Sequence, residues 1–188
     1  MKLRYVFVLL IPLIAGCATM PQLPGCVKIG PFGQACPLPP AALPAVEATH
    51  IVAVTHDGDR QTFMGRLRVD AESLRLAGFS LFGTHLFTIS YDGHDIVSRP
   101  ERAELHADLI VVMLEAALAE PTELRPRLHG ITLKLSGTGD TEVRELYEHG
   151  RLVARIETTG KPLKAARIVM TIPPAKLTLR MTPLGADQ

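Results

Sequence analysis

Short segments in which apolar and polar residues alternate follow one another from His50 to Met181. The segment 62–69 shows this most clearly, because Phe, Gly, Leu and Val alternate there with Thr, Met and two Arg residues. A period of two places one set of side chains on a buried face of a β-sheet and the other on a wet face. Turn residues such as Asp92-Gly93 separate the segments. The pattern predicts strands at about 50–55, 62–69, 74–79, 85–91, 95–98, 131–135, 142–147, 152–158, 166–172 and 176–181.

One helix interrupts the series of strands. Residues 103–119 carry apolar side chains at helical spacing, and little more than His106, Asp108 and Glu115 is polar. A helix with so broad an apolar surface must be buried on most sides, and a large antiparallel sheet must curl or close to manage its edges. We therefore expect a mainly β (α+β) fold, in which a curved antiparallel sheet or half-open barrel of about ten strands surrounds one apolar helix.

The first seventeen residues are typical of an export signal that ends in a cysteine. Lys2 and Arg4 precede an apolar run of about 11 residues, which is too short to span a bilayer and suits a secretory signal. The sequence Ile-Ala-Gly-Cys that ends at Cys17 resembles the lipobox of bacterial lipoproteins. The resemblance implies a lipoprotein signal peptide over residues 1–16 and acyl chains on Cys17. The alternative is an ordinary signal peptide with a cysteine near its cleavage site.

The same resemblance implies a location. Several acyl chains hold a protein on a membrane much longer than one chain does, so the membrane is the first expected partner. Ala18, and not aspartate, follows the cysteine, which by resemblance to enterobacterial sorting signals favours the outer membrane. We expect a lipid-anchored protein at the periplasmic face of that membrane.

Residues 17–46 differ from the rest of the chain because prolines and glycines are frequent in them. Proline fixes φ and lacks a donor, so we expect a lipidated, proline-rich tether there. Cys26 and Cys36 lie within it, and in an oxidising compartment such a pair is typical of a disulfide. The disulfide would close a loop of about 10 residues and contribute roughly 2.7 kcal/mol. The alternative, a metal or redox pair, needs closer spacing or more ligands.

The remaining residues, 47–188, are enough for a single domain with a core. Without the signal, Lys plus Arg falls from 20 to 18 against 19 Asp plus Glu, so the mature chain has a net charge of about −1. There is no tryptophan, and aromatic residues make up only 5%. Neither a basic face nor stacking platforms are therefore available, and we expect no nucleic acid partner.

Two polar clusters are the candidates for catalysis. Residues 91–95 read Tyr-Asp-Gly-His-Asp, and residues 147–150 read Tyr-Glu-His-Gly. Both are positioned where a hairpin turns, and turns favour these residue types for conformational reasons. The histidines show no metal-binding helical spacing, and no nucleophile elbow or phosphate loop is present. We expect no enzyme activity, no metal site and no cofactor; a hydrolase that uses His94 or His149 is the third-ranked hypothesis.

The segment 78–93, Gly-Phe-Ser-Leu-Phe-Gly-Thr-His-Leu-Phe-Thr-Ile-Ser-Tyr-Asp-Gly, and the helix sequence Ala-Asp-Leu-Ile-Val-Val-Met-Leu at 107–114 resemble a particular family. It is an uncharacterised lipoprotein family of Gram-negative bacteria, a domain of unknown function often encoded among aryl polyene pigment genes. The resemblance implies a fold similar to the periplasmic lipoprotein carriers LolA and LolB. Those are half-closed antiparallel barrels whose apolar cavity holds acyl chains.

We therefore expect a lipoprotein that binds or hands over an acylated, hydrophobic cargo, either a lipoprotein acyl chain or a polyene-type lipid, received from a periplasmic carrier protein. Flexible methionine side chains suit variable acyl ligands. The simpler interpretation of any one apolar residue is core packing. The alternative function is a structural or assembly lipoprotein that docks an envelope complex and has no ligand cavity. The expected cavity lining is Phe63, Leu67, Phe82, Phe87, Ile89, Leu109, Val112 and Met113.

Overall fold

The main feature of the protein is one antiparallel sheet of ten strands in the order β7-β6-β5-β4-β3-β13-β12-β11-β10-β9. The computed structural model describes residues 22–100, 106–160 and 165–184 of the 188-residue chain. The strands are β3 (Val46–His56), β4 (Asp59–Val69), β5 (Leu74–Phe79), β6 (His85–Tyr91), β7 (Ile96–Arg99), β9 (Thr132–Thr138), β10 (Thr141–Glu148), β11 (Arg151–Thr159), β12 (Arg167–Ile172) and β13 (Leu177–Pro183).

The sheet consists of two meanders of five strands each. Strands β3 to β7 form one and β9 to β13 form the other, and the two join where β3 pairs with β13, with Val54 opposite Leu179. Within the described part of the chain, β7 and β9 are the two edge strands, because each pairs with a neighbouring strand on one side only. The expected mainly β fold with a curved antiparallel sheet of about ten strands is confirmed, and the sheet is open.

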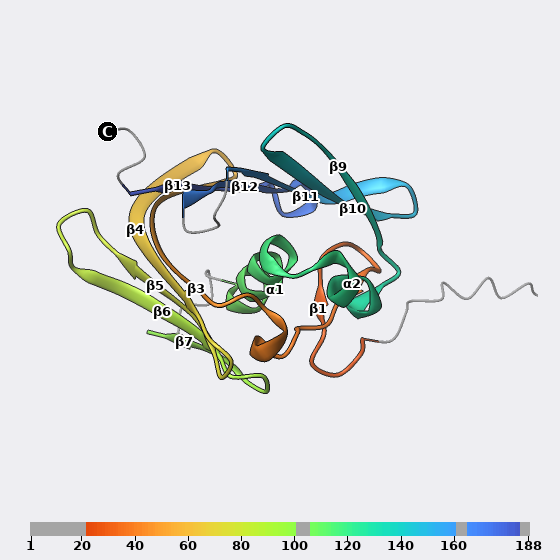
Figure 1. The fold of residues 1–188 in the computed structure, drawn as a ribbon, viewed down its shortest axis with the longest axis horizontal. Helices are drawn as coiled ribbons and strands as arrows, with labels where there is room; N and C mark the ends of the chain where they lie inside the picture. The colour runs from red at the N-terminus through yellow and green to blue at the C-terminus, as the bar shows by residue number, and fades with distance from the viewer. Residues whose placement is uncertain (1–21, 101–105, 161–164, 185–188) are drawn as a thin grey trace, which may run out of the picture.

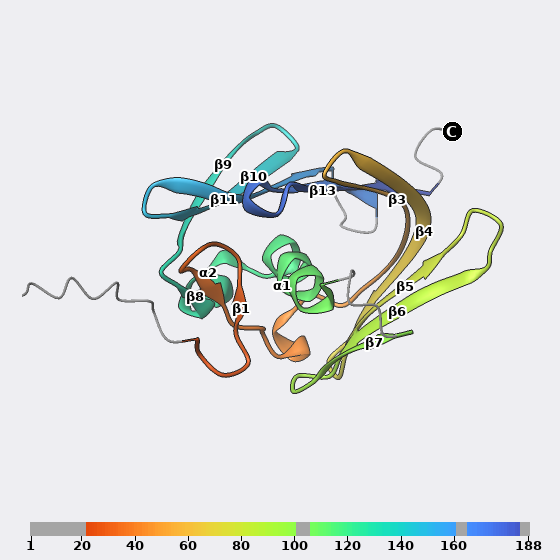
Figure 2. The same ribbon diagram turned by 180° about the vertical axis from the view of Figure 1, so that it is seen from behind.

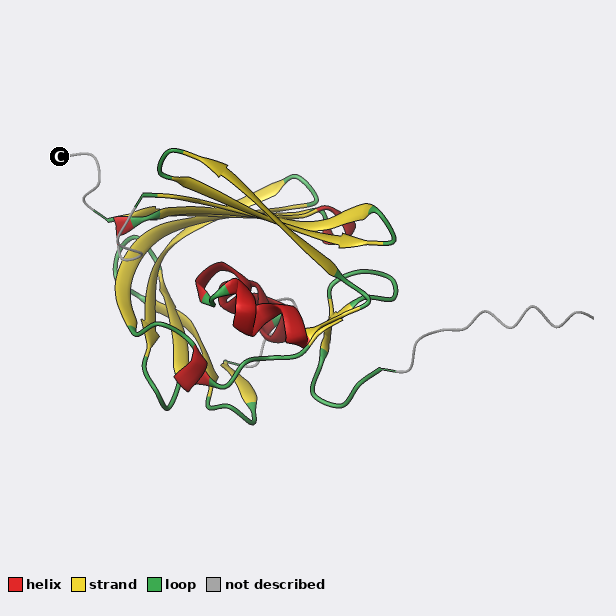
Figure 3. Ribbon diagram, turned by 45° about the vertical axis from the view of Figure 1, so that its right-hand side comes forward, coloured by secondary structure: helices red, strands yellow, loops and turns green. Residues whose placement is uncertain are grey.

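Helix α1 (Ala107–Leu118) lies in the hollow of the curved sheet (Figures 1 and 3). Its residues 111–118 are all buried, as the broadly apolar sequence predicts. The four-residue helix α2 (Pro121–Leu124) follows it. The expected helix began at residue 103, and residues 103–105 lie outside the described residues. Among the described helices, none has both the length and the apolar character that a membrane span requires.

The alternation of residues along the strands explains how the sheet faces the helix. On β5, Leu74, Leu76 and Gly78 are buried, whereas Arg75 between them is exposed. Gly78 has no room for a side chain, because a Cβ atom there would lie 2.3 Å from the Phe87 ring. The close approach of this ring to the backbone packs the inner face densely.

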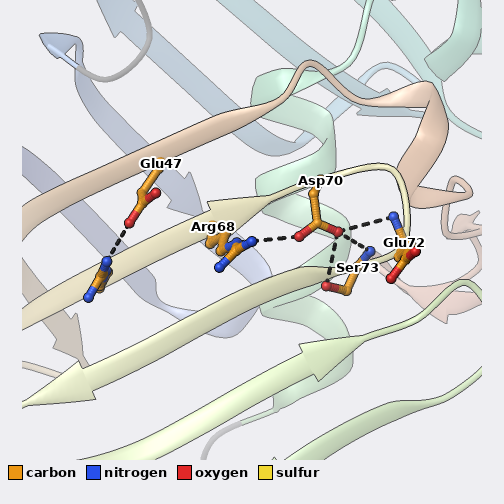
Figure 4. Close-up of polar contacts among 6 residues, drawn as sticks. Glu47, Arg68, Asp70, Glu72 and Ser73 are labelled. Carbon is orange, nitrogen blue, oxygen red and sulfur yellow. Dashed lines mark hydrogen bonds and ion pairs between the residues drawn. The ribbon is translucent and has the colours of Figure 1, made fainter.

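The outer face of β3 and β4 is polar (Figure 4). Glu47 forms an ion pair with Arg66, and Arg68 Nε lies 3.3 Å from Asp70 Oδ2. Asp70 Oδ1 also accepts the backbone N–H of Ser73 at 2.9 Å, which holds the turn between β4 and β5. Exposed ion pairs contribute little to stability, so this face is solvated and the inner face supplies most of the folding energy.

Residues 22–46, the described part of the proline-rich segment, pack against the domain, whereas we expected a tether. They form β1 (Val27–Lys28) and β2 (Gln34–Ala35), which make a small sheet with β8 (Leu128–His129). This sheet lies on the open side of the large sheet, beside α1 and α2 (Figures 1 and 2). The segment contributes the buried side chains Val27, Ile29, Ala35, Leu38 and Leu43 to the core. Prolines stop this stretch from forming long strands but do not stop it from covering an apolar surface.

The expected disulfide is confirmed. Cys26 and Cys36 are bonded, and the bond joins the two arms of the β1–β2 hairpin. The expected lipidation site Cys17 and the signal peptide lie outside the described residues.

A buried carboxylate anchors this hairpin to the large sheet. Glu148, at the end of β10, is 4% exposed. It accepts the backbone N–H of Phe32 at 2.6 Å and the N–H of Gly33. Gly33 and Gly30 leave room for this carboxylate, because a Cβ on either glycine would collide with neighbouring side chains. Glu148 therefore compensates one buried backbone donor, the N–H of Gly33, and one part-buried donor, the N–H of Phe32.

Replacing Glu148 tests this anchor. Glu148→Ala leaves the buried N–H of Gly33 and the part-buried N–H of Phe32 without this acceptor. We therefore expect the free energy of unfolding to fall by about 1–3 kcal/mol. Urea unfolding of the chain from Ala18 onward measures it. The matched control is Glu157→Ala on the outer face, where we expect a change within about 0.5 kcal/mol. Equal losses in the two variants would contradict the anchoring role.

Candidate functional site

A small apolar cavity separates α1 from the inner face of the sheet. Its volume is about 20 Å³, which is room for about one water molecule. Every lining residue is apolar, and the lining comes from both meanders as well as from the helix. The lining residues are Val52, Leu76, Leu109, Ile110, Met113, Leu114, Met170, Ile172, Leu177, Leu179 and Met181.

The helical part of the lining comes from the first two turns of α1. Leu109, Ile110, Met113 and Leu114 are spaced by three and four residues, so they lie on one face of the helix. The cavity therefore lies under the first two turns of α1. Met113 faces Met170 and Met181 across it as part of the same lining, and unbranched thioether side chains adapt easily to a changed shape.

The C-terminal end of α1 is firmly held by Arg144 of β10. Its Nη1 donates to the carbonyl oxygens of Ala116 at 2.9 Å and Ala119 at 2.5 Å. These carbonyls lie at the end of the helix, where carbonyl groups have no N–H partners within the helix. The partial negative charge of a helix C-terminus also attracts a positively charged side chain. Glu142 in turn accepts from Arg144 Nε at 2.5 Å. Arg144 thus satisfies the helix end and fixes its position on the sheet.

Glu115 holds the same end of α1 to the N-terminal segment. Its side chain is 2% exposed, and Oε2 accepts the backbone N–H of Leu38 at 3.0 Å. Oε1 has no hydrogen-bond partner among the described residues. Burial raises the pKa of Glu115 to about 8, although the Leu38 N–H and the nearby Arg127 oppose the shift. The carboxyl is therefore mostly protonated at neutral pH.

The N-terminal end of α1 is held less firmly. The residue before the helix, His106, is left-handed with φ +36° and gives no side-chain cap. Asp108 Oδ1 accepts the N–H of Leu109 at 2.8 Å, which is a contact within the first turn only. Leu109 and Ile110 are half-buried, whereas residues 111–118 are buried. The helix is thus anchored at its C-terminal end, and its half-buried residues Leu109 and Ile110 lie over the cavity.

The structure brings some of the expected lining residues to the cavity and not others. Leu109 and Met113 line it. Five more pack in the same core without lining the cavity: Phe63, Leu67, Phe87, Ile89 and Val112. Phe82 lies elsewhere, because it is 99% exposed. Contact of these residues with a ligand stays a prediction.

Phe82 and Leu81 form the tip of the β5–β6 hairpin, which projects from the sheet at the left of Figure 1. Leu81 is 62% exposed. The turn satisfies its own backbone: Ser80 Oγ accepts the N–H groups of Phe82 at 3.3 Å and Thr84 at 3.1 Å, and the Ser80 carbonyl accepts from Gly83 at 2.9 Å. No Asp or Glu occurs from residue 73 to residue 91. The tip can therefore enter an apolar environment without leaving these donors unpaired.

The two polar clusters that were candidates for catalysis build turns. Asp92 Oδ1 accepts the N–H groups of His94 and Asp95, both at 2.9 Å. His149 and Gly150 have φ values of +47° and +79° and form the two-residue turn between β10 and β11, as such hairpins require. In the parts of the chain that are described, no group of three or more His, Cys, Asp and Glu side chains could hold a metal ion.

A second cleft, of about 470 Å³, lies between the N-terminal segment and the β6–β7 turn. Tyr91, His94, Asp108 and Arg127 line its polar part. Because both charge signs are present, the cleft favours neither a simple anion nor a simple cation.

Comparison with known proteins gives a family but no activity. A family model with the description "Protein of unknown function (DUF3261)" matches residues 47–185, from the start of β3 to just beyond β13. No curated protein matches the chain.

Glu115 makes stability depend on pH with a defined sign. The folded chain keeps this proton up to pH about 8, whereas an unfolded glutamate releases it near its ordinary pKa of about 4.3. The stabilisation is fully present below the unfolded pKa and is lost as pH rises through 8. We expect Glu115→Gln to remove a slope of at most about 1.4 kcal/mol per pH unit between about pH 5 and 8.

Urea unfolding at pH 5.5, 7 and 8.5 measures this difference from the unsubstituted chain. The exposed Glu123→Gln on α2 is the control and should leave the slope unchanged. Parallel curves for Glu115→Gln and the unsubstituted chain would show that Glu115 does not carry a proton in the folded state.

Proposed function

We propose that this chain, which belongs to the DUF3261 family of unknown function, binds an acyl chain between α1 and the inner face of the sheet. The chain would then pass the acylated cargo to a membrane. One observation carries the proposal: a wholly apolar cavity lies under the first two turns of an apolar helix, whose N-terminal end is held less firmly than its C-terminal end. The cargo would be a lipoprotein acyl chain or a polyene-type lipid, and no covalent step is involved.

The cavity is too small to hold an acyl chain in the closed form, since about 20 Å³ takes only one water molecule. Binding therefore requires the first two turns of α1 to move away from the sheet while Arg144 and Glu115 hold its last turn. Burying a 14-carbon chain contributes roughly 10 kcal/mol at the usual increment per methylene. This gain is large enough to offset the loss of the contacts that Leu109, Ile110 and Met113 make in the closed form.

The location proposed for the protein follows from the lipobox resemblance at Cys17. Acyl chains on this residue would hold the domain at the periplasmic face of the outer membrane. Release of a cargo chain then needs an equally apolar acceptor, and the bilayer provides one nearby. The exposed Leu81–Phe82 tip supports such a transfer, because two bulky apolar side chains on a self-satisfied turn can enter the membrane interface. A fold similar to the LolA and LolB carriers, which the family resemblance implies, would serve the same kind of transfer.

A structural lipoprotein that docks an envelope complex is the second candidate. The near-solid packing between α1 and the sheet favours it, because a cavity of about 20 Å³ is common in proteins that bind no ligand. In this case the apolar residues are core alone, and the exposed tip is a contact for a protein.

Binding of a fluorescent fatty acid to the chain from Ala18 onward separates the two candidates. Leu109→Asp places a carboxylate in the cavity lining, at a half-buried position near the helix start where the fold should tolerate it. We expect at least tenfold weaker binding. The control Ala107→Asp adds the same charge in the same turn at a residue outside the lining, and should bind as the unsubstituted chain does. An unsubstituted chain that binds no fatty acid would favour the docking lipoprotein.

The rate of transfer tests the tip. In the double variant Leu81→Ser/Phe82→Ser, we expect the fluorescent fatty acid to move to vesicles of phosphatidylethanolamine and phosphatidylglycerol about tenfold more slowly. The equilibrium affinity for the fatty acid should not change, because the tip lies outside the cavity lining. Phe32→Ser, at another exposed phenylalanine, is the control. An unchanged rate in the double variant would exclude a role of the tip in transfer.

A further inference from the structure

The cleft between the N-terminal segment and the β6–β7 turn is separate from the apolar cavity. Asp108 lines the cleft from the first turn of α1, on a different side of the helix from Met113, which lines the cavity. The volume of the cleft, about 470 Å³, is within the range of sites that bind small molecules. The cleft can therefore hold a ligand of its own.

One buried side chain presents an unused hydroxyl group to the cleft. Tyr91 lines the cleft although it is only 4% exposed, and its hydroxyl makes no hydrogen bond to any described residue. The hydroxyl is not enclosed by protein either. Among the described residues, the enclosed side-chain atoms that have no partner are His50 Nδ1 and Glu115 Oε1. The Tyr91 hydroxyl therefore opens into the cleft, where a ligand can satisfy it.

Arg127 provides a positive charge near this hydroxyl. Burial and Glu115 raise the pKa of Tyr91, and the guanidinium group of Arg127 opposes the rise, so this group is close enough to act on the phenol. The raised pKa keeps the hydroxyl protonated at neutral pH, as a hydrogen-bond donor. The backbone of Arg127 is fixed, because its carbonyl accepts the N–H of Cys36 at 2.9 Å. A guanidinium group and a hydroxyl donor near each other suit a phosphate group.

Asp108 adds a negative charge to the same cleft. One of its oxygens, Oδ1, accepts the N–H of Leu109 at 2.8 Å. Across the described ranges of the chain, neither Asp108 nor Arg127 takes part in an ion pair. The two charges therefore do not neutralise each other. A ligand that carries both a phosphate group and an ammonium group would match both of them.

The length of chain before the cleft indicates where such a ligand would come from. Gln22, the first described residue, lines the cleft, and Cys17 is five residues before it. Five residues span at most roughly 18 Å. The lipid anchor proposed at Cys17 would thus keep the cleft close to the surface of the bilayer, where lipid head groups are the most abundant ligands of this chemistry.

We propose that this cleft binds the phosphoethanolamine head group of a membrane lipid. The phosphate group accepts hydrogen bonds from Arg127 and from the Tyr91 hydroxyl, and the ammonium group faces the carboxylate of Asp108. The inference rests on the proposed anchor at Cys17 for the source of the ligand. It does not rest on the proposed transfer of an acyl chain.

Ligand-observed NMR of glycerophosphoethanolamine, with the full chain in detergent micelles, tests the site. This probe has no acyl chains, so its binding does not depend on the cavity under α1 or on the transfer of a fatty acid. We expect it to bind at least tenfold more tightly than glycerophosphoglycerol, which has no ammonium group, and than ethanolamine, which has no phosphate group. Equal binding of the three compounds, or no binding of the probe, would overturn the proposal.

Three substitutions assign the contacts. Tyr91→Phe removes only a hydroxyl without a partner among the described residues, so the fold should stay intact while the probe binds about fivefold more weakly. Arg127→Gln should weaken binding at least tenfold, and Asp108→Asn should remove the preference over glycerophosphoglycerol. Arg99→Gln and Asp59→Asn make the same charge changes at exposed residues outside the cleft and should bind as the unsubstituted chain does. Circular dichroism checks the fold, and unchanged binding by Arg127→Gln or unchanged preference in Asp108→Asn would contradict the assignment.

Lipid nanodiscs distinguish a membrane lipid from a soluble compound with the same head group. When the full chain is bound to discs that contain phosphatidylethanolamine, the lipid should occupy the cleft. The soluble probe should then bind at least tenfold more weakly than it does with discs of phosphatidylglycerol alone. Elution of the chain together with the discs checks the anchor separately. Equal binding of the probe with both kinds of disc would overturn the membrane lipid as the ligand.

Discussion

The inner face of an open, ten-stranded sheet must be covered, and the rest of the structure depends on this requirement. A closed barrel would cover its inner face with its own opposite wall. Here the two meanders meet only at β3 and β13, so a wide apolar surface faces the open side. α1 fills the hollow, and the β1–β2 hairpin covers the side of α1 that the sheet does not reach (Figure 3). This arrangement explains why the helix is apolar on nearly all sides and why the proline-rich segment is folded.

Three buried polar residues hold these covering elements in place, and each acts on backbone groups. The charge of the buried Arg144 is compensated, because Glu142 and two helix carbonyls accept hydrogen bonds from its guanidinium group. Glu148 accepts from two N–H groups of the hairpin loop. Glu115 receives one N–H and keeps an oxygen without a partner among the described residues. Apolar packing alone is not directional, so these residues fix where the helix and the hairpin lie.

Alternation, helical spacing and turn residues were sufficient to predict the strands and the helix, because those features depend on local spacing. The disulfide was predicted from the two cysteines of a chain that carries an export signal. They were not sufficient for the small sheet: β1, β2 and β8 have two residues each, and two residues show no period. Phe82 was placed in the cavity since it is apolar and adjoins a strand, but the ladder ends at Phe79 and His85, so its side chain belongs to the turn. The anchoring roles of Glu115, Arg144 and Glu148 could not be predicted, because the backbone groups that they bind are distant in sequence.

The connections of α1 to the rest of the chain determine whether this helix can move away from the inner face of the sheet. The chain enters α1 from β7 and continues through α2 and β8 to β9, which are the two edge strands of the sheet. A movement of the N-terminal half of α1 would therefore displace an edge strand and would break no hydrogen bond between central strands. The anchors at the C-terminal half, Arg144 and Glu115, would stay in place during such a movement. In an open sheet whose helix is connected to the edge strands, the helix can thus change its position while the hydrogen bonds between the strands stay intact. A closed barrel of the same strands has no edge strands to which a helix could be connected in this way.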